Sequence, residues 1–141
     1  METIEKTAIT VEATVNAPIE KVWDCWTAPE HITQWCFASA DWQAPWAKND
    51  LEAGGRFATR MEAKDGSFGF DFGGVYNEIT ALAHILYTMD DGRKVEIHFT
   101  QQDGAVKVVE TFEAENQNSI EMQRMGWQAI LDNFKSYTEA A

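Results

Sequence analysis

Hydrophobic and polar residues alternate along most of the chain, at the spacing of two that places successive side chains on opposite faces of a strand. The first such stretch is TAITVEATVN, and the others follow Gly54-Gly55; together they are residues 7–16, 56–63, 67–79, 82–89, 93–100 and 105–113. Short turns ending in Gly66, Gly92 and Gly104 separate successive stretches and are typical of hairpins. The pattern therefore predicts an antiparallel meander.

Apolar residues recur every three or four positions, as in a helix, in two parts of the chain. The first part lies between the strand at 7–16 and Gly54. Pro18 stands at a favoured first-turn position, and apolar residues recur every three or four positions up to Trp26. Ala28-Pro29 ends this helix, and a second short helix is expected from Pro29 to Trp35. Residues 36–53 are expected to be irregular.

A long amphipathic helix is predicted at the end of the chain, from near Asn118 to about Thr138, with Glu121 as the second member of a capping-box-like pair. One face of it carries Ile120, Gln123, Trp127, Ile130, Leu131, Phe134 and Thr138. Strands grouped apart from helices predict an α+β fold.

Two polar residues lie in otherwise apolar rows. Gln123 lies on the apolar face of the long helix, where an amide needs a polar strand residue, a water or a ligand as partner. Glu110 shares one strand face with Val108 and Phe112, and this face is either the inner one or the solvent-exposed one. If Glu110 points inward, burial raises its pKa unless a cation compensates.

Composition narrows the function classes. The 141 residues fit one domain, 1–141, and the aromatic content of 12% indicates a bulky core or a cavity lined by rings. A net charge of −12 disfavours nucleic acid and anionic membrane as partners. Cys25 and Cys36 lack CxxC spacing, and the chain shows neither a secretory signal nor an apolar run of about 18 residues. We therefore expect a cytoplasmic protein, monomer or homodimer.

The chain contains no motif typical of a nucleophile–base pair, a nucleotide or a cofactor. His31, His84 and His98 fall in separate elements without HxH or HxxxH spacing, so the spacing predicts no metal site and no cofactor. Both cysteines are interpreted as small buried hydrophobes. The acidic pairs Asp90-Asp91 and Glu113/Glu115 are interpreted as solvated, and Glu62 and Asp71 as facing solvent, paired with Arg56, Arg60 or Lys64.

Four segments in order resemble a known family. They are APIEKVWDCWTAPEHITQW (17–35), the strand with Gly54, Gly55, Phe57 and Met61, the strand with Gly74, Tyr76, Glu78 and Ile79, and the helix with Gly126, Trp127, Ile130 and Leu131. Together they are similar to the heat-shock-protein-90 ATPase-activator-homologue-like family of the SRPBCC or START-like superfamily, which includes birch-pollen-allergen-type domains.

The resemblance implies a helix-grip fold, in which a curved antiparallel β-sheet wraps around the long C-terminal helix and two short helices follow the first strand. It also implies an apolar cavity between sheet and helix, with Gly126 allowing close approach and Gln123 facing the cavity. Relatives in the superfamily bind lipids, steroids or polyketides, and some are enzymes. The eukaryotic co-chaperones that name the family carry an additional N-terminal domain, for which we expect no room here.

The leading hypothesis is a binder of an apolar or aromatic small molecule. Its predicted cavity residues are Trp35, Trp42, Phe57, Met61, Phe70, Phe72, Tyr76, Ile97, Phe99, Glu110, Gln123 and Trp127. One alternative is a cyclase- or hydrolase-type enzyme that uses an inward Glu110 with Gln123 or Tyr76. The other is a chaperone-associated interaction module, which predicts an exposed apolar patch.

Overall fold

The structure, a computed structural model, describes residues 7–141. Within them lie eight strands and three helices. In chain order these are β1 (Ala8–Val15), α1 (Ile19–Thr27), α2 (Pro29–Trp35), β2 (Trp42–Gln43), β3 (Ala47–Asn49), β4 (Arg56–Ala63), β5 (Gly69–Thr80), β6 (His84–Met89), β7 (Lys94–Gln102), β8 (Ala105–Glu113) and α3 (Ile120–Ala140).

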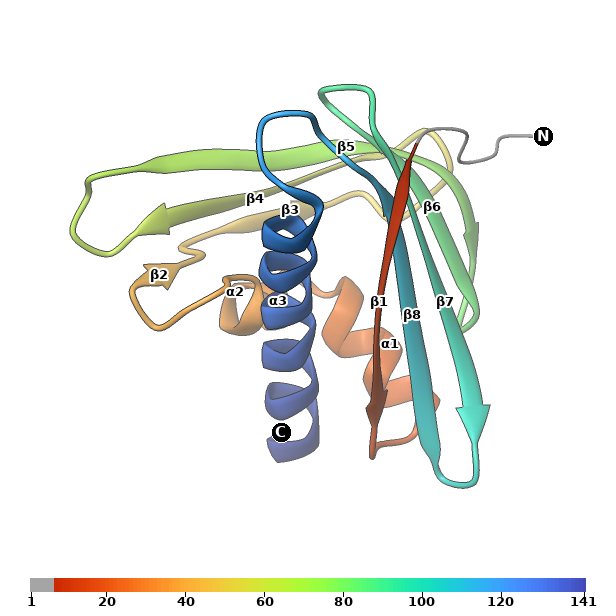
Figure 1. The fold of residues 1–141 in the computed structure, drawn as a ribbon. Helices are drawn as coiled ribbons and strands as arrows, with labels where there is room; N and C mark the ends of the chain where they lie inside the picture. The colour runs from red at the N-terminus through yellow and green to blue at the C-terminus, as the bar shows by residue number, and fades with distance from the viewer. Residues whose placement is uncertain (1–6) are drawn as a thin grey trace.

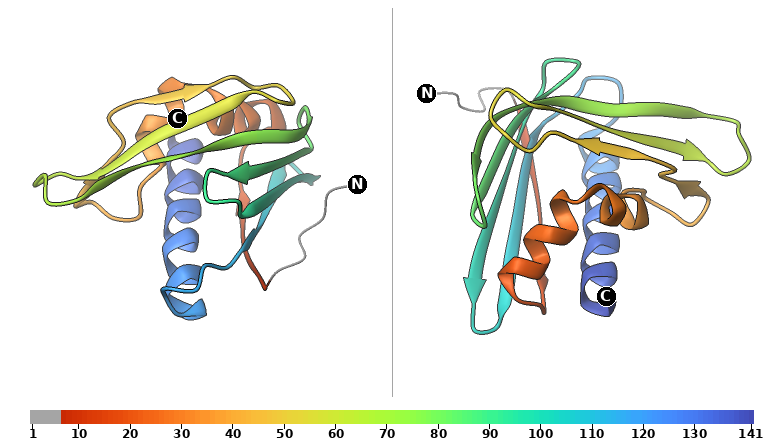
Figure 2. Two further views of the ribbon diagram at one scale, coloured as in Figure 1. Left: turned by 90° about the horizontal axis from the view of Figure 1, so that it is seen from above. Right: turned by 180° about the vertical axis from the view of Figure 1, so that it is seen from behind.

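One antiparallel sheet contains all the strands, in the order β1-β8-β7-β6-β5-β4-β2, with β3 also paired to β4. Figures 1 and 2 show the sheet curving so that β4 and β5 run across the top of the molecule while α3 lies inside the bend. A register shift between Tyr76 and Glu78 marks a bulge in β5, a feature that bends and twists a strand. The α+β helix-grip fold expected from the sequence is confirmed.

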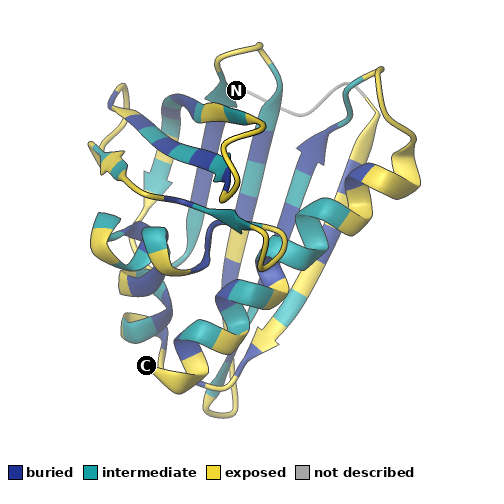
Figure 3. Ribbon diagram, turned by 90° about the vertical axis from the view of Figure 1, so that its left-hand side faces the viewer, coloured by how far each residue is buried: buried dark blue, intermediate teal, exposed yellow. Residues whose placement is uncertain are grey.

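The strands alternate buried and exposed positions as the sequence predicts, and Figure 3 shows the alternation as bands of colour. In β8, Val106, Val108, Glu110 and Phe112 are buried. They face the same side of the sheet as Ile97 and Phe99 of β7, where the core lies. The ion pairs of Arg60 with Glu62 (3.2 Å) and with Asp71 (3.1 Å) form as predicted.

The long helix was predicted to start near Asn118 and begins at Ile120. Ser119 is its N-cap residue, and the Ser119 hydroxyl accepts a hydrogen bond from the Met122 amide at 3.1 Å. Leu131, Phe134 and Thr138 are buried as expected. Ile120, which the sequence places on the same face, is 40% exposed because it lies in the largely exposed first turn.

Three other expectations about local structure are wrong. The segment 36–53 is not wholly irregular, because β2 and β3 pair with β4; strands of two and three residues are too short to show alternation. A Cβ atom at Gly126 would meet nothing within 4 Å, so this glycine does not permit close helix–sheet packing. Glu113 is 4% exposed, not solvated, and its carboxylate accepts a hydrogen bond from the Lys94 amide at 2.6 Å.

Candidate functional site

A cavity of about 310 Å³ lies between α3, the concave face of the sheet and α2. Its wall is mainly aromatic and aliphatic, with a few polar side chains. The lining residues are Trp26, Ile32, Trp35, Cys36, Lys48, Asn49, Phe57, Thr59, Met61, Phe70, Phe72, Tyr76, Ile85, Tyr87, Met89, Arg93, Glu110, Glu115, Trp127, Ile130 and Leu131. The hollow beside the C-terminal helix that the resemblance implies is therefore present.

Ring-to-ring packing, edge-to-face in three pairs and tilted between Phe57 and Tyr76, holds the aromatic wall in place. The ring of Phe57 lies 4.7 Å from Tyr87 and 5.0 Å from Tyr76, measured between centroids. On the helical side, Trp26 and Trp35 each lie 4.9 Å from Phe134. Such pairs stabilise by about 0.5–1.5 kcal/mol beyond their buried area. The cavity wall is therefore built from rings that support one another.

The Glu110 carboxyl group is the acidic group buried deepest in this wall. The residue is 6% exposed, and burial raises its pKa to about 8. Within residues 7–141, no hydrogen bond or ion pair reaches this carboxyl group. At pH 7 the group is therefore mostly protonated, and its hydroxyl hydrogen and carbonyl oxygen are available to a bound molecule.

Two neighbouring groups are also held neutral. Burial, reinforced by the charge that Glu110 would carry, raises the pKa of the Cys36 thiol to about 12. Burial likewise raises the pKa of the Tyr87 hydroxyl. A thiol with such a pKa is a poor nucleophile. The side chains of Glu110, Cys36 and Tyr87 are therefore mostly uncharged at neutral pH.

Polar groups lie at the border of the cavity near β3 and the β6–β7 turn. The Tyr76 hydroxyl donates to Asn49 Oδ1 at 2.6 Å, and Asn49 Nδ2 donates to the Thr27 carbonyl at 2.5 Å. Arg93, also in the lining, pairs with Asp91 at 2.8 Å and donates to the Glu113 carbonyl at 3.3 Å. These bonds fix the orientation of the polar side chains around an apolar interior.

Eight of the twelve predicted site residues line this cavity; they are Trp35, Phe57, Met61, Phe70, Phe72, Tyr76, Glu110 and Trp127. Trp42 lies beside it, half-buried against Phe68 and Phe70. Ile97 and Phe99 face inward but are core residues; Phe99 packs edge-on against Trp23 at 5.3 Å and Trp26 at 5.7 Å.

Gln123 does not face the cavity, contrary to the expectation. Its Oε1 atom accepts from the Glu115 amide at 2.9 Å, and its Nε2 atom donates to the Glu115 and Asn118 carbonyls at 3.2 and 2.9 Å. The buried amide thus holds the loop before α3. It borders a separate hollow at the start of the helix, shared with Arg93 and Gly126.

Sequence reasoning missed several contributors to the site. Tyr87 could have been found, because it shares the inward phase of β6 with Ile85 and Met89. Trp26 was placed on the first helix but not in the cavity. A third group lies on the outer face of the sheet: pairing of β6 with β7 brings His84, Glu96 and His98 together, although their sequence spacing gave no sign of a cluster.

Comparison with known proteins places the chain in a family. The family model described as Activator of Hsp90 ATPase homolog 1-like protein matches residues 16–139. The chain belongs to this family. A comparison with curated proteins finds no match.

Solved structures of similar proteins have the same fold. The solution structure of an AHSA1-like protein from Aeromonas hydrophila is 45% identical, with a TM-score of 0.90, over 95% of this chain and 93% of that one. A protein from Cytophaga hutchinsonii is 56% identical, with a TM-score of 0.81, over 94% and 92%. A protein from Chromobacterium violaceum, at 21% identity and a TM-score of 0.81 over 94% and 98%, is similar in fold alone. Among the helices of residues 7–141, none is long and apolar enough to cross a membrane.

Proposed function

We propose that this protein binds a small apolar or aromatic molecule in the cavity between α3 and the sheet. The observation that carries the proposal is the buried Glu110 carboxyl group, which has no hydrogen-bond or ion-pair partner among residues 7–141 and lies in a mainly apolar wall. A buried polar group without a hydrogen bond costs about 1–3 kcal/mol, so a ligand that pairs with it gains that free energy on binding.

The cavity also indicates what kind of ligand fits. Its volume of about 310 Å³ is at the lower end of the range of about 300–1,000 Å³ typical of small-molecule sites. Rings on several sides favour a flat apolar body, which aromatic side chains hold by stacking and edge contacts. One hydrogen-bonding or basic group directed at Glu110 would fix its orientation.

An acid–base enzyme is the second candidate, and the observation that favours it is the Glu110 pKa of about 8. A general acid or base works best with a pKa near the operating pH. However, the Cys36 thiol nearby is held protonated, and the Tyr76 hydroxyl already donates to Asn49. The arrangement supplies one proton-transfer group and no activated nucleophile, so binding is the better-supported function.

A ligand screen tests the binding proposal. Tryptophan fluorescence and melting temperature are measured with a panel of flat apolar compounds, half of them bearing an amine, amide or hydroxyl group and half without. We expect hits to quench or shift the emission of Trp35 and Trp127, which line the cavity. Compounds with an amine can take the carboxyl proton and form an ion pair, so they should bind Glu110→Gln at least about tenfold more weakly; amides and alcohols can hydrogen-bond to either side chain.

Exposed Glu78 on β5 provides the matched control, and Glu78→Gln should leave every affinity unchanged. A panel that changes neither fluorescence nor melting temperature would contradict the proposal. Chemical turnover of a bound compound by the wild type and not by Glu110→Gln would instead establish the enzyme.

A further inference from the structure

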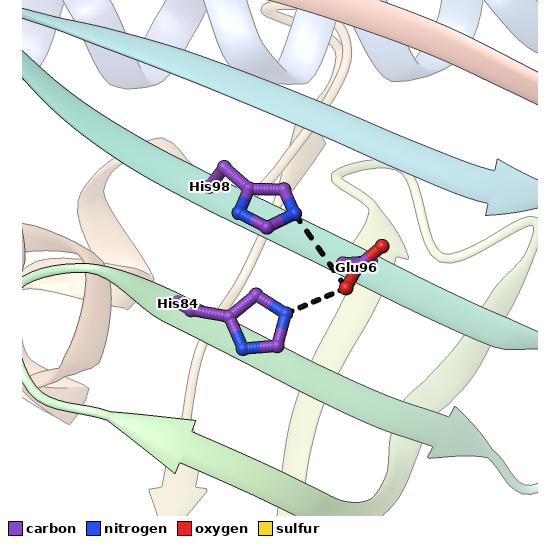
Figure 4. Close-up of side chains that lie close together, drawn as sticks. All are labelled: His84, Glu96 and His98. Carbon is purple, nitrogen blue, oxygen red and sulfur yellow. Dashed lines mark hydrogen bonds and ion pairs between the residues drawn. The ribbon is translucent and has the colours of Figure 1, made fainter. Parts of the chain in front are cut away.

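Two histidines and a glutamate meet on the outer face of the sheet, on the opposite side from the cavity. His84 of β6 lies directly across the ladder from His98 of β7, and Glu96 precedes His98 by two residues and so shares its face. Figure 4 shows the three side chains on the two neighbouring strands. The cluster is partly accessible: His98 is exposed, whereas His84 and Glu96 are half-buried.

Both imidazole rings direct Nε2 at the same carboxylate oxygen. His84 Nε2 lies 2.6 Å from Glu96 Oε2, and His98 Nε2 lies 3.5 Å from it. The rings are 4.6 Å apart between centroids and tilted by 31°. One ligand atom from each of the three residues lies within 4.8 Å of the others. Ligand atoms bound to one tetrahedral zinc ion at about 2.0–2.1 Å lie about 3.3 Å apart, so small side-chain rotations would bring all three into range.

We propose that His84, Glu96 and His98 form a binding site for a divalent transition-metal ion of the Zn²⁺, Ni²⁺ or Cu²⁺ type. Two neutral imidazoles and one carboxylate suit these borderline ions, whereas Ca²⁺ and Mg²⁺ require a larger set of oxygen ligands. The fourth position would be open to water, because the outer face is accessible at His98. The backbone ladder fixes the spacing of the two histidines, which lowers the entropic cost of assembling the ligands.

The charges around the cluster are compatible with a cation. Lys94 precedes Glu96 on the same face of β7, and Lys107 on β8 is paired with Glu12 at 3.7 Å. Glu78 on β5 adds a further negative charge opposite Leu86, beside His84. The net charge of −12 also raises the local concentration of cations.

The third histidine provides a matched control. His31 Nδ1 is hydrogen-bonded to the Tyr137 hydroxyl at 2.6 Å, and His31 Nε2 lies 3.4 Å from Asp24. This is one imidazole with one carboxylate, on the α1–α2 side of the molecule, so His31→Gln removes a histidine without altering the proposed site.

Calorimetric titration of metal-free protein with ZnCl₂ tests the proposal. We expect one equivalent to bind per chain, and His84→Gln, His98→Gln and Glu96→Gln each to weaken binding by at least about tenfold, the lower bound measured for residues that merely support metal ligands. His31→Gln should bind as the wild type does. Circular dichroism melts in EDTA check that each variant is folded.

A second measurement needs no variant. Substoichiometric Cu²⁺ added to ¹⁵N-labelled wild type should broaden the amide signals of residues 84–86 and 96–98 before those around His31. The proposal is overturned if no zinc binds at protein and metal concentrations up to about 1 mM, which corresponds to about −4 kcal/mol. It is equally overturned if His84→Gln and His98→Gln bind as the wild type does, or if copper broadens the His31 region first.

Discussion

Glu110 and Glu96 lie on neighbouring strands and differ by one step in register, yet their environments are opposite. Glu110 pairs across the ladder with Ile97, the residue that follows Glu96. Because strand side chains alternate, Glu110 points into the aromatic cavity and Glu96 points away from it. Glu110 has no partner in residues 7–141, whereas Glu96 contacts two histidines. The same side chain is therefore a neutral hydrogen-bonding group on one face and a charged ligand candidate on the other.

The difference shows that the face of the sheet decides the chemistry of a carboxylate more than its neighbours in sequence do. Desolvation dominates on the concave face, where burial is the cause of the raised pKa of Glu110. On the convex face, solvent remains close and charged partners are available, so an ion pair there contributes little to stability. Substitutions on the two faces should therefore have effects of different size and different pH dependence.

The largest expected effect comes from Glu110→Gln and depends on pH. The pKa of Glu110 rises from 4.5 to about 8 on folding. Below pH 4.5 both states are protonated; between pH 4.5 and 8 only the unfolded state ionises, so the wild type loses stability as pH rises through this window. The full loss is up to about 5 kcal/mol above pH 8. Urea denaturation at pH 5, 7 and 9 should show that the free energy of unfolding of Glu110→Gln rises relative to that of the wild type, by an amount of that order between pH 5 and pH 9.

All other ionisable groups are the same in both proteins, so their contributions cancel in this comparison. Glu78→Gln, on an exposed position of β5, should follow the wild type at every pH. A constant difference between Glu110→Gln and the wild type from pH 5 to pH 9 would show that Glu110 is ionised inside the fold, and the contrast with Glu96 would then fail.

The next effect tests the packing of the inner face. Phe112 is fully buried, and its ring stacks on Trp127 at 3.9 Å with an interplanar angle of 10°. Phe112→Ala should cost about 3–5 kcal/mol because it removes a large buried side chain and enlarges the space beside the cavity. Val109, on the outer face of the same strand opposite His98, is partly exposed, and Val109→Ala should cost about 1 kcal/mol or less.

Urea denaturation of the two variants at pH 5 gives the comparison. If Phe112→Ala does not fold, Phe112→Leu supplies a smaller loss with the same sign. Equal losses for Phe112→Leu and Val109→Ala would mean that the two faces are equally packed.

Most of the fold could be predicted from the sequence because its signals are local. The alternation predicted both ends of β4 and of β8 correctly, and the helical spacing after Pro18 and Pro29 predicted α1 and α2. The short strands β2 and β3 could not be found, since pairing with β4 creates them and no periodicity fits in two or three residues. The cap of α3 was displaced by one residue because Asn118 and Ser119 both have side chains that can cap a helix.

The sequence predicted residues of the candidate site only where the two-residue alternation of a strand showed which side chains point inward. The inward phase of β4 and β5 placed Phe57, Met61 and Tyr76 in the cavity wall. The sequence did not decide whether Glu110 points inward, because an error of one residue in the register moves every side chain of a strand to the other face. Gln123 was misplaced because its partners are backbone groups of a loop, and the cluster of His84 with His98 depends on a cross-strand register that the sequence spacing does not contain.

The smallest expected effect is that of Glu96→Gln in metal-free protein. His84 and Glu96 have side chains that are 18% and 34% exposed, and partly exposed pairs contribute about 0–1 kcal/mol. In EDTA the variant should therefore melt close to the wild type, far from the change expected for Glu110→Gln at high pH. With excess ZnCl₂ the wild type should melt at a higher temperature and Glu96→Gln should gain less, because an ion that binds only the folded state stabilises it according to its affinity. If Glu96→Gln lost several kcal/mol of its free energy of unfolding in EDTA, the Glu96 carboxylate would be needed for folding itself. Substitutions on the two faces would then not differ in the size of their effect on stability.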